Sequence, residues 1–278
     1  MGYDIIVLAG QSNAEGTGLG DGPVFQGDER ILRLYDPQDN GFAPNENGEM
    51  ILKVKRPWEF LIAPAEERFC DGCNRASFGL WFATEYIKHG LLQDGRKILM
   101  VNAAVGGTGF KRGHWGRGEI LSERLYEMLD KALLGEENKI VAFLWHQGEH
   151  DVFENMTLPR ETVYENYRAS LSTFFGDVRK KYSQCSFPIL AAGFSEQYCN
   201  QNEGYRSGCD TVLRATKSVC AELENAAVID TFDLRSNDQA SGNGDLVHFC
   251  RESLYELGKR YFEKYLQLLD KSAKKMVQ

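Results

Sequence analysis

The sequence predicts an α/β fold built on one doubly wound, parallel sheet of five strands. Five short apolar runs recur along the 278 residues, and each is bounded by turn residues. Each run is almost continuously apolar, which is typical of parallel strands that are covered on both faces. Amphipathic helical patterns lie between the runs, and this alternation favours βαβ units in a single sheet. A chain of this length can also bury a full hydrophobic core without disulfides or metal ions to stabilise it.

The expected elements follow from these patterns in chain order. Strands are predicted at Asp4–Ala9, Ile98–Val105, Ile140–Trp145, Pro188–Gly193 and Ala226–Ile229. Helices are predicted at Gly79–Leu92, Glu119–Leu134, Arg160–Tyr182, Thr211–Glu224 and Arg251–Leu269. No linker and no internal repeat interrupts the series, so we expect one domain over residues 1–278. The polar segment 271–278 is expected to fray.

Residues 16–75 break the alternation of strand and helix. This segment is rich in Gly, Asn, Asp and Pro, and it holds only one short apolar run, Ile31–Tyr35. A loop of this length inside a compact domain is usually functional or carries small elements of its own. Because it leaves from the end of the first predicted strand, we expect it to lie beside whatever site forms there.

Charge and cysteine content exclude several classes of protein. The chain has 32 Lys and Arg against 40 Asp and Glu, a net charge of −8, which argues against a nucleic-acid partner. No apolar stretch is long enough for a membrane span. Seven cysteines, an odd number in a long chain, indicate mostly free thiols and a reducing, cytoplasmic location, although a secreted form that has lost its leader stays open. Cys70 and Cys73 are either structural thiols or a local disulfide.

Polar residues follow the ends of the predicted strands. In a doubly wound sheet, ligands bind outside the carboxyl ends of the strands. The first strand is followed by Ser12, the second by Gly107 and the third by Gln147. Asp245 and His248 precede the last helix. A serine, a glycine, an amide, a carboxylate and an imidazole at one sheet edge are the parts that an acyl-transfer site requires.

Each of these residues has a chemical role in such a site. The Ser12 hydroxyl is the candidate nucleophile, and His248 is the candidate base that takes its proton. Asp245 lies three residues earlier, where a carboxylate can orient the imidazole. The backbone N–H groups of Ser12 and Gly107 and the side-chain amide of Gln147 are candidate oxyanion donors.

The same residues also have structural explanations when each is taken alone. Ser12 could cap the helix that follows the strand, since serine is common at helix starts. His248 could be a buried or capping histidine, and Asp245 could be a turn residue. The convergence of several separate strand ends on one edge is what favours the catalytic interpretation.

Four sequence blocks resemble a known family. Gly10–Asn13 reads GQSN, Val105–Thr108 reads VGGT, Trp145–Asp151 reads WHQGEHD, and Asp245–His248 reads DLVH. In this order they resemble the SGNH hydrolases, in the branch of sialate O-acetylesterases and carbohydrate esterase family six acetylxylan esterases. One residue departs from the family pattern: Ala14 stands where Met is usual.

The resemblance implies a three-layer, flavodoxin-like fold and a serine esterase that removes O-acetyl groups from carbohydrate without a metal or other cofactor. Ser12, His248 and Asp245 would form its catalytic triad. Acetylated xylan, sialic acid and related sugars are the implied substrates.

The resemblance also implies supporting residues at the site. Gln11, Asn13 and Glu149 would have that role, and Gly106 matches the family block nearly as well as Gly107. Glu149 occupies a position that the family keeps acidic, so it either supports Asp245 or competes with it.

Four further residues are candidates for facing the sugar, because aromatic rings stack on pyranose faces. They are Phe110, Lys111, Trp115 and Tyr198.

Three other functions are weighed against the esterase. His146 and His150 match the H-x-x-E-H zinc spacing, but that motif needs a helix, and here it follows a strand and contains Gly148. A flavodoxin-like FMN protein would share the fold and would not need His248. A carbohydrate-binding relative that has lost catalysis would keep the fold without turnover.

Overall fold

A seven-stranded sheet forms the centre of the computed structural model, which describes residues 2–38, 41–48, 50–54, 56–183 and 186–276. Its strand order is β11-β10-β9-β1-β8-β2-β5. Five strands coincide with predicted runs: β1 (Tyr3–Gly10), β8 (Lys97–Asn102), β9 (Lys139–His146), β10 (Ile189–Ala192) and β11 (Ala226–Ile229). All five are mutually parallel, as predicted.

The prediction of five strands is wrong, because the segment 16–75 adds two more to the sheet. β2 (Ile31–Tyr35) pairs parallel with β8, and β5 (Leu61–Pro64) closes the edge antiparallel to β2. Leu61 and Ile62 are exposed on this edge strand. A short edge strand with exposed side chains lacks the long apolar run by which the inner strands are recognised.

The rest of that segment carries small elements, as expected of a long loop. Two hairpins form it: β3 (Gly41–Pro44) with β4 (Met50–Lys53), and β6 (Arg68–Cys70) with β7 (Cys73–Arg75). Asp71 and Gly72 join β6 to β7 with φ of 52° and 79°, as a two-residue hairpin turn requires. Cys70 and Cys73 face each other across this hairpin as free thiols.

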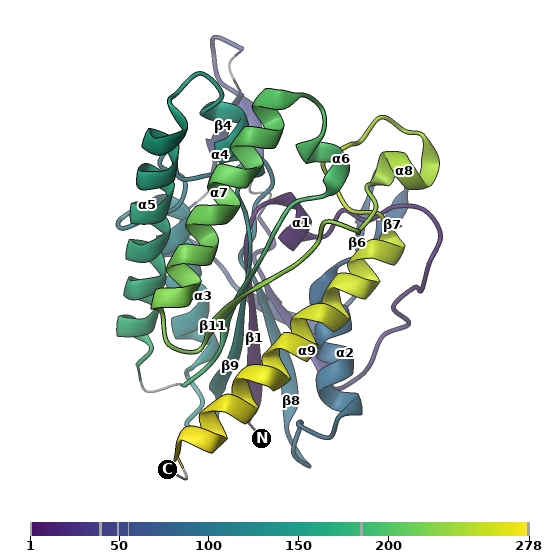
Figure 1. The fold of residues 1–278 in the computed structure, drawn as a ribbon. Coiled ribbons are helices and arrows are strands. Elements are labelled where there is room, and N and C mark those ends of the chain that lie inside the picture. The colour runs from purple at the N-terminus through teal and green to yellow at the C-terminus, as the bar shows by residue number, and fades with distance from the viewer. Residues whose placement is uncertain (1, 39–40, 49, 55, 184–185, 277–278) are drawn as a thin grey trace.

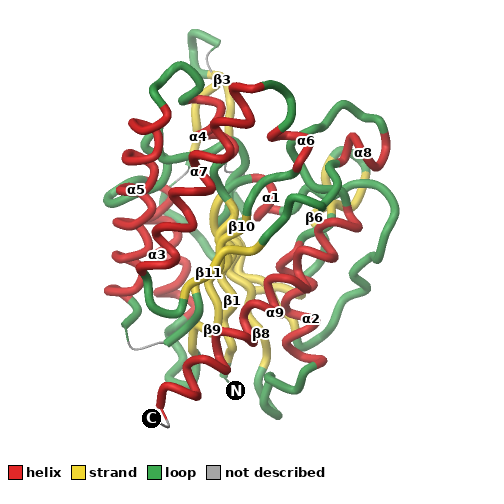
Figure 2. Tube along the Cα trace, in the orientation of Figure 1, coloured by secondary structure: helices red, strands yellow, loops and turns green. Residues whose placement is uncertain are grey.

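Helices cover both faces of the sheet, which confirms the three-layer fold (Figures 1 and 2). One face packs on α2 (Phe78–Lys88) and α9 (Arg251–Met276). The other packs on α3 (Ile120–Ala132), α5 (Arg160–Lys181) and α7 (Glu203–Glu222). Four short helices complete the fold: α1 (Ser12–Glu15), α4 (Glu149–Glu154), α6 (Glu196–Cys199) and α8 (Asn237–Ser241).

Three helix boundaries differ from the prediction by four residues or more. α2 ends at Lys88, four residues before the predicted Leu92. α7 begins eight residues early, at Glu203, because the Asn202 side chain caps it by accepting a hydrogen bond from Tyr205 N at 3.1 Å. α9 continues to Met276, so residues 271–276 are helical where fraying was expected, and 277–278 lie outside the described residues. No Gly or Pro interrupts the helix there. Of the helices described, none is both long and apolar enough to cross a lipid bilayer.

Helices α2 and α9 are in such close contact that glycine is needed where they meet. A Cβ at Gly258 would lie 2.5 Å from the Phe78 carbonyl oxygen and 2.6 Å from Trp81 Cβ. Beside this point the Phe78 ring stacks on Tyr261, with centroids 4.7 Å apart. The two helices therefore form one tightly packed layer on their face of the sheet.

Replacing Gly258 with alanine is expected to lower the free energy of unfolding by about 1–3 kcal/mol, because the new methyl group meets backbone atoms. The matched control is Gly176→Ala in α5, where a Cβ would meet nothing within 4 Å. That change is expected to stabilise the protein by up to about 1 kcal/mol through helix propensity. Urea unfolding of both variants measures the difference. Equal stabilisation by the two substitutions would contradict the close packing of α2 and α9.

Candidate active site

The nucleophile candidate lies at an abrupt turn from strand to helix. β1 ends at Gly10, whose φ is 122°. A Cβ on Gly10 would overlap the carbonyl oxygen of His146 in the neighbouring strand β9, so only glycine fits this position. Two residues later Ser12 opens α1 with 8% of its surface exposed. As a first-turn residue, Ser12 has a backbone N–H without an acceptor in its own helix.

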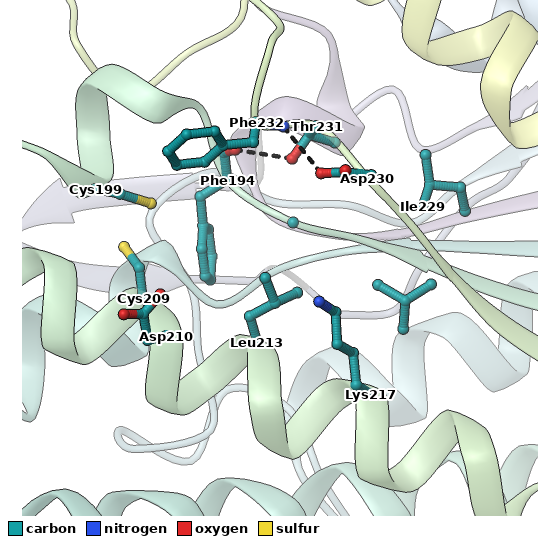
Figure 3. A pocket seen from close by; sticks show the side chains of 12 residues that line it. Phe194, Cys199, Cys209, Asp210, Leu213, Lys217, Ile229, Asp230, Thr231 and Phe232 are labelled. Atoms are coloured by element: carbon teal, nitrogen blue, oxygen red, sulfur yellow. Dashed lines mark hydrogen bonds between the residues drawn. The ribbon is translucent and has the colours of Figure 1, made fainter.

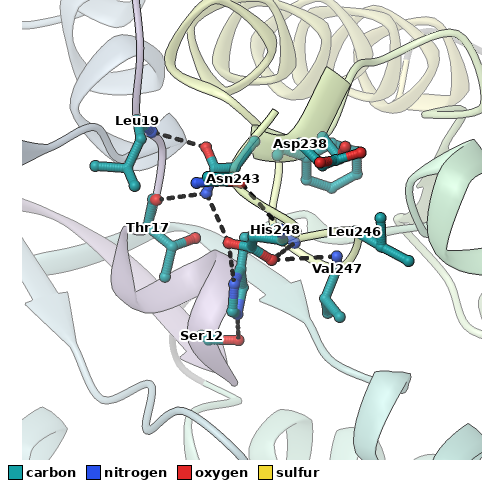
Figure 4. Close-up of polar contacts among 12 residues, drawn as sticks. Ser12, Thr17, Leu19, Asp238, Asn243, Leu246, Val247 and His248 are labelled. Carbon is teal, nitrogen blue, oxygen red and sulfur yellow. Dashed lines mark hydrogen bonds and ion pairs between the residues drawn. The ribbon is translucent and has the colours of Figure 1, made fainter. Parts of the chain in front are cut away.

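The three predicted triad residues lie in one hydrogen-bonded chain, although 236 residues separate Ser12 from His248. His248 Nε2 is 2.8 Å from Ser12 Oγ, and the two side chains point at each other in Figure 4. On the other side of the ring, His248 Nδ1 is 2.9 Å from Asp245 Oδ2. This is the arrangement in which an imidazole can take a serine proton.

Asp245 is itself held in place by its neighbours. Its Oδ1 accepts the backbone N–H groups of Val247 and His248, and Asn237 Nδ2 donates to its Oδ2 at 2.9 Å. Burial raises the pKa of Asp245, but the hydrogen bond from His248, its charge and the Asn237 amide outweigh this and lower the pKa to about 2. The carboxylate is therefore charged at neutral pH and accepts a hydrogen bond from the Nδ1–H group of His248. This assigns the tautomer that leaves Nε2 free to accept from Ser12.

Asn13 ties the loop that carries His248 to α1. Its Oδ1 accepts Phe249 N at 3.1 Å, and its Nδ2 donates to Val247 O at 3.4 Å. The same Nδ2 donates to Glu149 Oε1 at 2.8 Å. Glu149 is buried and lies 3.4 Å from His146 Nε2. Glu149 thus acts on the site through Asn13, and Asp245 is the carboxylate that contacts the imidazole.

A glycine loop lies against Ser12. A Cβ at Gly106 would be 3.4 Å from Ser12 Cβ, so this backbone passes beside the nucleophile. Glu15 Oε2 accepts Gly106 N at 3.0 Å, and Arg68 Nη1 holds Glu15 from the other side at 2.8 Å. The next N–H, that of Gly107, has no hydrogen-bond acceptor among the residues described. Gly107 therefore offers a free donor beside Ser12.

Gln147 lies in a buried network beneath this loop. Its Nε2 has three acceptors in reach: Gln11 Oε1 at 3.2 Å, Thr108 O at 3.1 Å and Asp151 Oδ2 at 2.7 Å. Its Oε1 accepts the Tyr167 hydroxyl at 3.1 Å. To donate to an oxyanion, the amide would have to release one of these acceptors. Gln11 is likewise engaged, because its Oε1 also accepts two backbone N–H groups where α4 begins.

Two of the four predicted sugar-facing residues, Trp115 and Tyr198, are buried in the core, so the prediction is wrong for them. Phe110 is half-buried, and for Phe110 and Lys111 the role stays a prediction. Trp115 is 1% exposed, and its Nε1 donates to Thr108 Oγ1. Tyr198 is buried with its hydroxyl on Glu149 O, and Phe110 packs on Trp145, Tyr167 and Phe174. Lys111 is exposed, and its backbone N–H donates to Asp151.

Sequence reasoning missed several residues that shape the site. Glu15 carries a usable signal, because it follows Ser12 by three residues and so lies near it in a helix. Asp151 lies in the block Trp145–Asp151 and accepts hydrogen bonds from the N–H groups of Phe110 and Lys111. These partners are in a loop about 40 residues earlier in the chain, so the sequence did not indicate the contact. Arg68 opens the short strand β6 and Asn237 opens the short helix α8. Neither element was predicted, and nothing in the sequence indicates the contacts of these two residues.

The two histidines with zinc-like spacing have separate surroundings. His146 ends β9, is fully buried and lies against Phe78 and Phe249. His150 is in α4, 3.7 Å from Glu154. Within the described ranges, no group of three or more His, Cys, Asp or Glu side chains is arranged to hold a metal ion.

A separate cavity of about 290 Å³ opens at the ends of β10 and β11. Phe194, Leu213 and Lys217 line it, and the sulfurs of Cys199 and Cys209 point toward each other at its side (Figure 3). None of the triad residues lines it. All six cysteines in the described part of the chain are free thiols, as expected, and Cys185 lies outside it.

Comparison with known proteins identifies the family. A family model described as carbohydrate esterase, sialic acid-specific acetylesterase, matches residues 2–267. A probable carbohydrate esterase of Arabidopsis thaliana is 27% identical over 268 residues, which cover 94% of this chain and 90% of the relative.

Solved structures share the fold. The crystal structure of an Arabidopsis thaliana protein covers 95% of this chain and 98% of its own, with TM-score 0.65 and 22% identity. The structure of NanS covers 97% and 98%, with TM-score 0.70 and 17% identity. A carbohydrate acetylesterase of Xanthomonas citri has TM-score 0.55 and 14% identity, covering 94% of this chain and 55% of its own.

These findings confirm the resemblance to the SGNH carbohydrate esterases that the four sequence blocks indicated. Because the family model spans nearly the whole chain, the protein belongs to the carbohydrate esterase family of sialic acid-specific acetylesterases and is a carbohydrate acetylesterase.

Proposed function

We propose that the protein is a serine esterase that removes O-acetyl groups from carbohydrate through an acyl-enzyme on Ser12. The observation that carries this proposal is the continuous hydrogen-bonded chain from Ser12 through His248 to Asp245. A flavodoxin-like FMN protein has no use for such a chain. A relative that only binds carbohydrate would not need it either.

Acylation begins when Ser12 Oγ attacks the carbonyl carbon of the acetyl group and its proton passes to His248 Nε2. Negative charge then develops on the former carbonyl oxygen. The N–H groups of Ser12 and Gly107 are the donors best able to stabilise it, and Gln147 can join them only by exchanging a buried hydrogen bond. His248 returns its proton to the sugar oxygen as the C–O bond breaks, which leaves acetyl-Ser12 and a free sugar hydroxyl.

Deacylation repeats these steps with water. His248 takes a proton from the water as its oxygen attacks the acetyl carbon. When the bond to Oγ breaks, acetate leaves and Ser12 regains its proton. Throughout both halves, Asp245 stabilises the imidazolium and keeps Nδ1 protonated.

The substrate class is an O-acetylated sugar. The family description names sialic acid, and acetylated xylan is the alternative that the sequence blocks raise. A panel of acetylated sialic acids, acetylated xylan and aryl acetates, assayed with wild-type protein, distinguishes these substrates.

Ser12→Ala is expected to reduce kcat on an aryl acetate by roughly 10⁴-fold or more, because the nucleophile of a triad is lost. Thermal stability should change little, since the exchange removes one hydroxyl whose partner, His248, is partly exposed and can bond water instead. Steady-state kinetics with a melting curve measures both. Near-normal turnover by the folded variant would refute the acyl-enzyme, and absence of turnover by the wild type would favour a binding protein.

Asp245→Asn is expected to cut kcat by about 10⁴-fold, because an amide can hold the wrong imidazole tautomer. Glu149→Gln, the matched control, should cost about tenfold or less, since its amide oxygen still accepts from Asn13. Circular dichroism confirms that both variants fold. A far larger loss in Glu149→Gln than in Asp245→Asn would reverse the assignment of the acidic partner.

The wild-type kcat/KM is expected to fall along a series of aryl esters from acetate to octanoate and to be unaffected by a chelator. In the sequence, no long apolar run follows a strand end, so we expect little apolar surface at the site to bind a fatty chain. The series is measured with and without EDTA. Rising kcat/KM with chain length would contradict the acetyl preference, and activity lost to EDTA and restored by zinc would show a metal requirement.

A further inference from the structure

Resting on the proposed function, we propose that Phe42 sets the acyl-group specificity of the site. Its ring, carried by the β3–β4 hairpin, closes the acyl side of the pocket around Ser12, so that an acetyl group fits and longer acyl groups do not.

The ring of Phe42 lies directly against the glycine loop. A Cβ at Gly107 would be 3.2 Å from Phe42 Cε2 and 3.6 Å from Cδ2. Gly107 has a φ of 70°, and its missing side chain is what lets the ring approach. The ring thus contacts the residue that follows Gly106, and Gly106 is the glycine beside Ser12.

The hairpin holds this ring on its inward face. Phe42 pairs with Leu52, which packs on the core, whereas Ile51, on the opposite face of the hairpin, is exposed. Phe42 also meets the edge of the His114 ring, with centroids 5.6 Å apart. Alternation along the strands therefore directs Phe42 toward the site.

Tetrahedral geometry at the reacting carbon assigns the ring to the acyl group. The departing sugar oxygen must lie near His248 Nε2 to receive its proton, and the oxyanion must lie near the N–H groups of Ser12 and Gly107. The acyl chain takes the remaining direction. Phe42 contacts Gly107, whose N–H is an oxyanion donor, and His114, whereas no ring contact joins it to His248 among the described residues. Its ring therefore lies on the side of the carbonyl group and its acyl chain, and not where the sugar departs.

Phe42→Ala is expected to raise kcat/KM for 4-nitrophenyl butyrate relative to the acetate by about tenfold or more, since each methylene that a pocket accepts or rejects is worth 10–200-fold. The matched controls are Ile51→Ala, on the exposed face of the same hairpin, and Leu52→Ala, the cross-strand partner. Both should leave the butyrate-to-acetate ratio within about twofold of wild type.

Phe42→Leu provides a second variant if the alanine form does not fold, and it should shift the ratio in the same direction by a smaller factor. A folded Phe42 variant that hydrolyses the acetate with an unchanged ratio overturns this inference and leaves the esterase intact. An equal shift in Leu52→Ala would assign the effect to a loosened hairpin and also overturn it. If wild-type protein turns over no ester at all, the proposed function fails first, and the inference fails with it.

Discussion

The hydrogen bonds of Asn13 are the constraint on which the site depends. Ser12 and His248 come from opposite ends of the sequence, and their reactive atoms must stay 2.8 Å apart. Asn13 adjoins the nucleophile and bonds the backbone on both sides of the histidine, at Val247 O and Phe249 N. Buried Glu149 fixes that amide in turn. The spacing of the nucleophile and its base is thus set by one side chain that performs no chemistry itself.

Several groups at the site are each held in place by a hydrogen bond to a carboxylate. Asp245 orients His248, Glu149 orients Asn13, and Glu15 accepts the N–H of Gly106 in the glycine loop. Asp151 accepts two N–H groups just beyond that loop. Carboxylates suit this purpose because each charged oxygen is a strong hydrogen-bond acceptor. A buried carboxylate is also stable only when donors surround its oxygens. Of these four carboxylates, only Asp245 contacts the imidazole of His248. The sequence motifs contain several acidic residues, and the motifs alone do not show which of them makes this contact.

The sequence was sufficient to predict the sheet centre and the triad candidates for one physical reason. Inner parallel strands must be apolar on both faces, so their ends are easy to locate, and those ends bring Ser12, Gly107 and Gln147 to one edge. The edge strand β5 has exposed side chains and lacks that pattern, and the short run of β2 beside it stands in a long polar segment, so neither was assigned to the sheet. The rings of Trp115 and Tyr198 were misassigned because a loop residue's burial depends on distant contacts. Gln147 donates to Asp151 and to Thr108 O. No rule of sequence spacing predicts these two hydrogen bonds.

The division of the triad between the two ends of the chain has a consequence for biosynthesis. Ser12 leaves the ribosome before Asp245 and His248, and strands β1, β8 and β9 can assemble around it in the meantime. Asp245 and His248 follow only after the whole sheet has been made. A truncated product that ends before them would carry the nucleophile and the oxyanion loop without a base. On the proposed mechanism such a product would not deacetylate a sugar, because no imidazole could take the proton of Ser12.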